Sequence, residues 1–318
     1  MNMKEIGGYI ELDKYYLPML HENAIALNLA RNCLAYLIEA KRIKKIAIPK
    51  LLCDSVGIIC RSAGVKISYY SVGLDFLPVD IEVEKEEWLY LVNFYGQICN
   101  EKIESIKNKY GKLIVDNVQA YFQKPVQGID TIYTCRKFFG VPDGAFLYTD
   151  KVIERELEQD FSYDKMMHIM GRFEKTASEF YGEYANGEEA FAGVPLKRMS
   201  RLTDNLLHAI NYSSVAKIRT DNFRNLHDSF EKINKLRLSI PQGAFMYPLY
   251  IENGAEVREA LRAKKIYIPT LWPAVFKLCK ESDLEYDMAM NILPIPIDQR
   301  YGIEEIKYLI AEVGKYII

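Results

Sequence analysis

The stretch of sequence that decides the fold is Thr131-Ile-Tyr-Thr-Cys-Arg-Lys-Phe-Phe-Gly-Val-Pro-Asp-Gly-Ala-Phe-Leu-Tyr-Thr149. Its two ends, TIYT and AFLYT, have the apolar and β-branched composition of buried strands. The residues between them include proline and glycine, which predicts a turn. Lys137 lies in this turn beside Arg136 and next to Phe138 and Phe139. A surface lysine usually has polar neighbours, so this one requires an explanation.

The residues before this stretch alternate between strand-like and helix-like segments. The strand-like segments read KKIAIP, KISYYSV, WLYLVNF and KLIVD. The helix-like segments cover residues 24–40, 55–63 and 101–110. Apolar strands that alternate with helices of about 10 residues predict crossover units and a mostly parallel sheet between two layers of helices. The predicted fold class is therefore α/β.

The residues after this stretch predict a second, smaller unit. Apolar residues recur at helical spacing from Val215 to Ile233, which predicts one long helix. Beyond Pro241 the sequence predicts the strands FMYPLYI, KIYIP and NILPIPI, the helix VREALRA and a final amphipathic helix. We expect a large domain over residues 1–225 and a small C-terminal α+β domain over residues 226–318.

Composition restricts the possible functions. The 318 residues are 49% hydrophobic and 26% charged, which is typical of a folded domain, and the net charge is −2. A nucleic-acid partner is not expected at this charge. The six cysteines form no CxxC pair or Cys/His cluster, so no metal site is predicted. The sequence has neither a signal peptide nor a run of roughly 20 apolar residues, which predicts a cytoplasmic protein with no membrane partner.

An acid and an amine follow neighbouring strands. Asp116 ends one predicted strand, Thr134 ends the next, and Lys137 comes three residues later. Ligands of parallel sheets bind beyond the carboxyl ends of the strands. Pyridoxal phosphate requires this pair, because a lysine forms its Schiff base and an acid contacts its pyridine nitrogen. Apolar neighbours and an adjacent cation would favour the neutral, nucleophilic form of the lysine.

The same residues also have a structural interpretation. Asp116 could cap a helix beginning at Asn117, and Lys137 could be a surface lysine on a hairpin. Residue types and spacing leave both interpretations open.

Further motifs occur in a fixed order along the chain. Asp116-Asn-Val-Gln119-Ala is similar to the pattern Asp-x-x-(His/Gln)-(Ala/Ser), and Thr134-Cys-Arg-Lys137 is similar to Ser-Phe-His-x-x-Lys. Together with these, the chain resembles the DegT/DnrJ/StrS family of nucleotide-sugar aminotransferases, which are fold type I pyridoxal-phosphate enzymes. The other similar segments are VNFYGQ with Gly96, Asp143-Gly144-Ala145, Lys197-Arg-Met-Ser200 and Arg219–Phe223.

The resemblance implies a role for each matching residue. Lys137 would be the Schiff-base lysine, and Asp116 would contact the pyridine nitrogen. Gln119 would lie near the cofactor O3′, and Thr134 would donate its hydroxyl to the phosphate. The loop from Thr134 to Lys137 is two residues shorter than the usual spacing.

Two parts of the implied cofactor site depart from the family pattern. The phosphate-binding Ser-Gly-Thr loop falls on Arg31, Asn32 and Cys33, so backbone N–H groups, Arg31 or Asn32 would have to hold the phosphate. The ring-stacking aromatic residue falls on Cys53. As residue types, Cys33, Cys53 and Cys135 are each expected to be small buried hydrophobes.

The resemblance implies an aminotransferase that moves an amino group from an amino acid, with glutamate the expected donor, to a keto-sugar or similar carbonyl. It also implies a homodimer. A pyridoxal-phosphate sugar dehydratase is an alternative, although known dehydratases of the family carry histidine at the lysine position. A non-catalytic binding protein that keeps the fold is a third interpretation, suggested by Cys53 and the absent Ser-Gly-Thr loop.

Overall fold

Eight strands form the central sheet of the larger unit, in the order β1-β8-β7-β6-β5-β2-β3-β4. The computed structural model describes residues 6–191 and 193–317, without the side chains of 188–190. The five strands from β7 to β3 run parallel, while β8, β1 and β4 are antiparallel to their neighbours. The predicted mostly parallel α/β sheet is therefore confirmed. The strands are β1 (Ile25–Leu27), β2 (Lys45–Pro49), β3 (Lys66–Val72), β4 (Pro78–Val79), β5 (Trp88–Val92), β6 (Leu113–Asp116), β7 (Asp130–Thr134) and β8 (Ala145–Tyr148).

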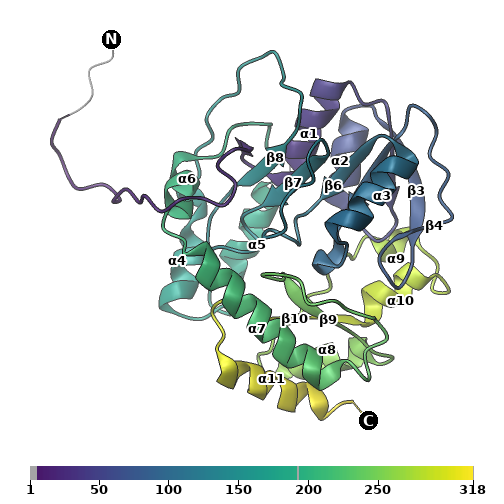
Figure 1. The fold of residues 1–318 in the computed structure, drawn as a ribbon. Coiled ribbons are helices and arrows are strands. Elements are labelled where there is room, and N and C mark those ends of the chain that lie inside the picture. The colour runs from purple at the N-terminus through teal and green to yellow at the C-terminus, as the bar shows by residue number, and fades with distance from the viewer. Residues whose placement is uncertain (1–5, 192, 318) are drawn as a thin grey trace.

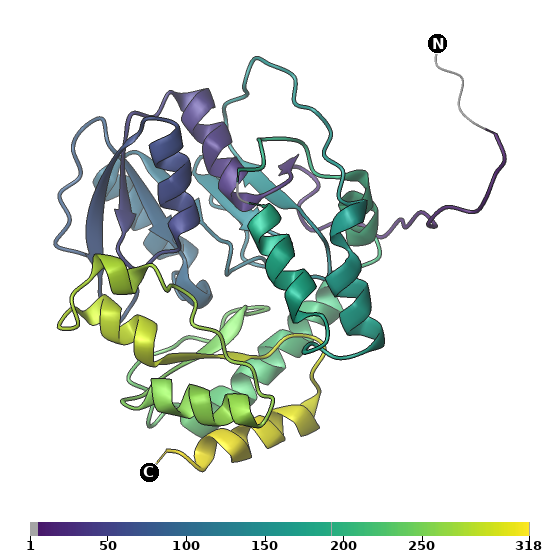
Figure 2. The ribbon, with the colours of Figure 1, turned by 180° about the vertical axis from the view of Figure 1, so that it is seen from behind.

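Helices cover both faces of this sheet. The helices α1 (Ala30–Lys41) and α2 (Asp54–Ser62) lie on one face, and α3 (Asn100–Tyr110) lies on the other (Figures 1 and 2). Six side chains of α1 are buried, whereas α3 buries only Ile103 and Ile106. The difference follows from the sequences, because α3 is polar apart from a narrow apolar stripe.

Four helices lie between the hairpin of β7 and β8 and the smaller unit. They are α4 (Met167–Glu174), α5 (Tyr181–Ala190), α6 (Arg201–Leu207) and α7 (Tyr212–Phe230). Side chains cap the starts of the last two, because Ser200 accepts from the Thr203 N–H and Asn211 from the Ser214 N–H. The predicted long helix corresponds to α7, and it contains both residues of the predicted boundary at 225/226, which stays a prediction.

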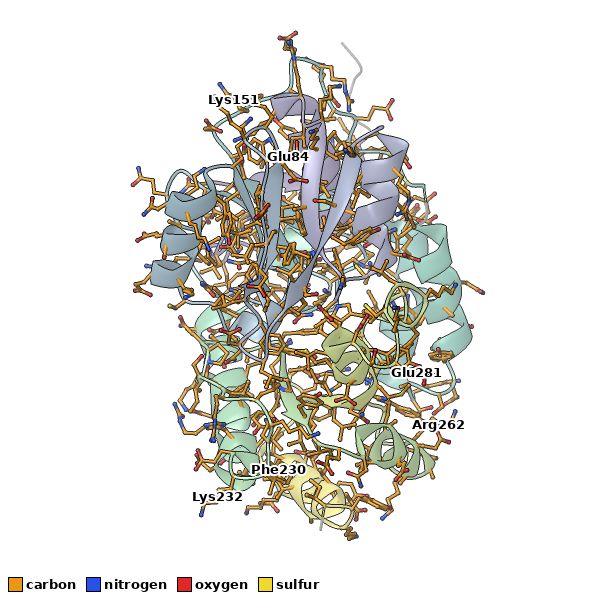
Figure 3. All side chains as sticks on the ribbon, turned by 90° about the vertical axis from the view of Figure 1, so that its right-hand side faces the viewer. Glu84, Lys151, Phe230, Lys232, Arg262 and Glu281 are labelled. Atoms are coloured by element: carbon orange, nitrogen blue, oxygen red, sulfur yellow. The ribbon has the colours of Figure 1, made fainter. Side chains whose placement is uncertain are left out.

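The smaller unit packs below the carboxyl ends of the parallel strands (Figures 1 and 3). In Figure 3, Glu84 and Lys151 lie toward the far end of the larger unit, and Phe230 and Lys232 lie at the opposite end of the molecule. The smaller unit has its own buried apolar cluster, so its packing does not depend only on the core of the larger unit. Its elements are β9 (Met246–Tyr250), α8 (Gly254–Ala263), α9 (Val275–Leu278), α10 (Leu284–Asn291), β10 (Ile292–Pro296) and α11 (Ile303–Gly314).

Two predicted elements differ in the structure. The segment KIYIP forms no strand, although Ile266 and Ile268 are buried in the small core. Lys265 has a φ of 61°, and the Ile266 N–H bonds to the last turn of α8, so the chain turns here instead of pairing with a strand. The predicted helix over residues 24–40 begins only at Ala30, because Ile25–Leu27 pair with β8 at the sheet edge. No helix in the described part of the chain is long and apolar enough to cross a bilayer.

Candidate active site

Asp116 lies at the carboxyl end of β6, in register with Val92 of β5 and Ile132 of β7. Only 4% of the residue is exposed. Its Oδ2 accepts a hydrogen bond from the Tyr90 hydroxyl at 2.7 Å, and its Oδ1 accepts from the Val118 N–H at 2.9 Å. Burial raises the pKa of Asp116, while the charge of Lys137 and these two hydrogen bonds act in the opposite direction. Asp116 therefore caps the turn that follows it, whereas the helix that could begin at Asn117 does not form.

Lys137 lies in the turn between β7 and β8, and its side chain is exposed. Phe138 and Phe139 are buried in an apolar cluster while Lys137 is exposed, so the expected apolar surroundings of the amine are not provided by burial beside these two rings. The amine lies instead 5.6 Å from the centre of the Phe245 ring. Asp116 ends β6 and Thr134 ends the parallel strand β7 three residues before Lys137, so the structure places the predicted acid and the lysine turn at the same end of the sheet.

A cavity of about 810 Å³ opens beside Lys137. This volume lies within the range of ligand-binding clefts. The lysine turn, α4, Arg219 and residues 298–300 line the cavity, and Asp116 is not among its lining residues. Arg300 also lines it, and its guanidinium bonds to Asp298 at 2.6 and 2.8 Å.

Gln119 and Thr134 are both buried near this end of the sheet. Gln119 Oε1 accepts the Tyr95 N–H at 2.7 Å, whereas its Nε2 has no hydrogen-bond acceptor among the described residues. Thr134 pairs with Ala145 in the hairpin just before the lysine turn. Gln119 can therefore donate to a bound group.

The first turn of α1 has no side-chain cap and no acidic residue. The side chains predicted to bind the phosphate, Arg31 and Asn32, have protein partners instead. Asn32 uses its Nδ2 on Asn28 Oδ1 at 2.9 Å and on the Pro195 carbonyl at 3.0 Å, while Arg31 donates to the Phe191 carbonyl at 3.5 Å. The Cys33 thiol is fully buried, and burial followed by the nearby Asp116 charge raises its pKa. The Asn32 and Cys33 N–H groups already bond to the Leu29 carbonyl, so the N–H groups of Ala30 and Arg31 are the backbone donors without an acceptor among the described residues.

Lys137 is the predicted site residue that lines the lysine cavity; none of the predicted cofactor-binding residues does, and Cys53 lines a different one. Cys53 is exposed, so the expectation of a buried hydrophobe is wrong for this cysteine, although it is correct for Cys33 and Cys135. Its thiol contacts Ser55 Oγ at 2.9 Å. It lines a separate cavity of about 200 Å³ together with Lys50.

Sequence reasoning did not find two contacts near the site. Tyr90 was part of an apolar run, although a buried tyrosine usually needs a partner for its hydroxyl, and here that partner is Asp116. Asp143 accepts from the Ser200 N–H at 2.9 Å and from the Ser200 hydroxyl at 2.7 Å. The contact between Asp143 and Ser200 joins the motifs Asp143-Gly144-Ala145 and Lys197-Arg-Met-Ser200. The presence of both motifs in the sequence was the signal that could have predicted it.

No protein-family model matches the sequence, and no curated protein matches it. Solved structures do. DesV from S. venezuelae, in complex with a ketimine intermediate, aligns over 92% of this chain and 84% of its own, with a TM-score of 0.65 and 14% identity. The chain has the fold of a sugar aminotransferase.

Two further structures lead to the same fold. A DegT DnrJ EryC1 StrS aminotransferase from Brucella abortus aligns over 93% of this chain and 86% of its own, with a TM-score of 0.63 and 14% identity. NtdA from Bacillus subtilis, with bound cofactor PMP, aligns over 92% of this chain and 72% of its own, with a TM-score of 0.65 and 12% identity. The resemblance in fold seen in the sequence motifs is thus confirmed. At these identities the comparison concerns the sugar aminotransferase fold, and function must be argued from the site.

Proposed function

We propose that the protein is a pyridoxal-phosphate-dependent aminotransferase that moves an amino group from an amino acid, with glutamate the expected donor, to a keto-sugar or similar carbonyl. One observation carries the proposal: the buried carboxyl of Asp116 ends β6, and Lys137 follows the end of the neighbouring parallel strand β7 by three residues. The aminotransferase fold of the chain supports it.

The groups present fit the cofactor at its ring end. Asp116 would hold a proton at the pyridine nitrogen, and Gln119, whose Nε2 lacks an acceptor, would donate to O3′. When bound, pyridoxal phosphate supplies a ring that accepts electrons from the substrate Cα. At the phosphate end, the N–H groups of Ala30 and Arg31 at the start of α1 and the Thr134 hydroxyl would be the donors. Cys53 at the stacking position and Arg31 at the phosphate stay predictions.

Lys137 has the freedom that this chemistry requires. Its exposed side chain borders the cavity, so the amine can be attached and then displaced while remaining nearby. In its unprotonated form, the displaced amine would take a proton from the substrate Cα and return it to a neighbouring carbon. The wall formed by α4 would separate this reaction from bulk water on one side.

The test begins with the purified protein and pyridoxal phosphate, followed by borohydride reduction and peptide mass spectrometry. We expect the label on Lys137, a yellow complex before reduction, and loss of both in Lys137→Ala. Adding glutamate without an acceptor should convert the complex to its pyridoxamine form in one turnover. Labelling of Lys137→Ala at the same level would contradict the proposal.

A non-catalytic binding protein is the second candidate. Two observations favour it: Cys53 lies outside the lysine cavity, and the Asn32 amide is occupied by other groups. In the same experiment, a labelled Lys137 that shows no turnover with glutamate or other amino acids would favour this candidate. The homodimer, the cytoplasmic location and the division into domains at 225/226 are also proposals.

A further inference from the structure

Arg219 of α7 is a buried cation without a carboxylate partner among the described residues. Only 1% of it is exposed, and it has no salt bridge to any acid that the structure describes. Desolvation lowers the pKa of its guanidinium to about 10. A charge buried in this way needs compensating hydrogen bonds, so the groups it contacts are informative.

The guanidinium joins three segments of the chain. Its Nη2 donates to the Phe138 carbonyl at 3.2 Å. Its Nη1 donates to the carbonyls of Ala244 and Phe245 at 3.1 and 3.2 Å. Its Nε donates to Gln299 Oε1 at 2.8 Å. A planar fork with fixed donors can hold these segments at one separation, which a lysine could not do.

Gln299 holds the same backbone carbonyl as Arg219. Its Nε2 donates to the same Phe138 carbonyl at 2.8 Å, so this oxygen accepts two hydrogen bonds. Asn222 lies about one helical turn after Arg219 and bonds to the carbonyls of Ile297 and Tyr301 at 3.2 and 2.9 Å. It thereby fixes both ends of the loop that carries Gln299. The motif Arg219–Phe223 has this physical role in the described structure.

These contacts surround Lys137. Phe138 is the next residue in the chain, and its carbonyl is the one held twice. Phe245, whose carbonyl Arg219 also holds, provides the ring 5.6 Å from the Lys137 amine. The backbone behind the amine and the ring beside it are therefore tied to one guanidinium.

We infer that Arg219 and Gln299 are positioning residues for Lys137. They hold the turn after β7 against α7 and the smaller unit, and so keep an otherwise exposed amine within reach of a group bound at Asp116. The inference rests on the proposed function only in taking Lys137 as the reacting amine.

The test uses Gln299→Leu, which keeps the shape and removes the donor, and Arg219→Lys, which keeps the charge and removes the fork. Arg224→Lys is the matched control, because Arg224 also lies on α7 but is half-exposed and bonds to Asp221. Two quantities are measured on the full chain. One is amide hydrogen exchange of residues 138–141, and the other is the borohydride-trapped label on Lys137 relative to that on exposed Lys217 of α7.

In Gln299→Leu we expect exchange at residues 138–141 to become at least about tenfold faster and the Lys137-to-Lys217 label ratio to fall about tenfold, because leucine removes both the donor to the Phe138 carbonyl and the acceptor of Arg219 Nε. Exchange in α11 and in the Arg224→Lys control should stay unchanged. If Arg219→Lys does not fold, the result for Gln299→Leu alone tests the inference. The inference would be overturned if amide exchange at residues 138–141 stayed at the wild-type rate. It would also be overturned if exchange became faster while the label ratio stayed unchanged. If Lys137 and Lys217 are labelled equally in the wild type, the proposed function is refuted. Hydrogen exchange at residues 138–141 would then still test whether Gln299 holds the turn.

Discussion

The carboxyl group of Asp116 is buried without an ion pair among the described residues. Two hydrogen bonds, from Tyr90 and Val118, are its only direct partners there. Burial raises its pKa above the ordinary value of 3.8, against the opposing effect of Lys137. The folded state therefore keeps the proton at a pH where the unfolded chain has lost it. Its contribution to stability is full below pH 3.8 and is lost as the pH rises through the folded-state pKa.

We expect Asp116→Asn to stabilise the protein without cofactor. At pH 7 the free energy of unfolding should rise by about 1 kcal/mol, because the amide avoids burying a charge. The gain should shrink as the pH falls and the wild-type carboxyl becomes protonated. Urea unfolding between pH 4 and 8 measures this, and labelling of Lys137 in the same variant should be lost. A variant less stable than the wild type at pH 7 would contradict the interpretation.

Asp298 is a control for Asp116, because its pKa is shifted in the opposite direction. Burial acts to raise its pKa, but the hydrogen bonds and charge of Arg300 outweigh burial, and the pKa is lowered. Its contribution is present above pH 3.8 and is lost as the pH falls through the lower folded-state pKa. Asp298→Asn should therefore lose about 1 kcal/mol at neutral pH, and less in acid. The two substitutions should give opposite slopes against pH.

The helix α6 approaches the hairpin of β7 and β8 unusually closely. Asp143 accepts hydrogen bonds from Ser200, the N-cap of α6, and from the Thr203 hydroxyl. Gly144 follows with a φ of +109°, and a Cβ built there would lie 2.8 Å from Thr203 Cγ2. Glycine is therefore required both by the backbone conformation and by the neighbouring helix. This contact fixes the end of the lysine turn.

We expect Gly144→Ala to lower the free energy of unfolding by about 2–4 kcal/mol, through backbone strain and the displacement of α6. Gly128→Ala is the control, because Gly128 also has a positive φ of 76° but has no atom within 4 Å of the built Cβ. Its cost should be about 1 kcal/mol, from strain alone. Equal losses in urea unfolding would show that the approach of α6 has no energetic consequence.

At the scale of the whole molecule, the first residues that the structure describes, from residue 6 onward, extend away from the body (Figures 1 and 2). Ile6, Tyr9 and Ile10 are each more than 90% exposed. The segment is attached further along, where the Leu17 N–H bonds to the His208 carbonyl at 2.9 Å. Apolar side chains exposed in this way are unusual in a monomer.

We expect the purified protein to be a homodimer, as the family resemblance implies, because that family builds each site from two subunits. Sedimentation velocity over a dilution series measures the mass of the species. Labelling of Lys137 and turnover with glutamate, followed over the same series, should fall as the dimer dissociates. Full activity in a monomer would refute the expectation.

The elements and their order could be predicted from the sequence. The apolar runs of β2, β3, β5 and β6 and the turn residues between β7 and β8 are local signals, and they indicated a parallel sheet with a hairpin. The placement of Asp116 and Lys137 at one end of the sheet followed from that topology, since parallel strands end at the same edge. The segment KIYIP shows the limit, because its alternating apolar residues are buried without pairing.

By itself, then, the sequence determined the fold class, the order of elements and the candidate acid–lysine pair, because these depend on periodicity and chain order. Tertiary structure alone decided the exposure of Lys137 and Cys53, the hydrogen bond from Tyr90 to Asp116, and the junction at Arg219. Those features depend on side chains far apart in the sequence. Their burial and hydrogen bonds are set only when the strands pair and, at Arg219, when the two units pack together.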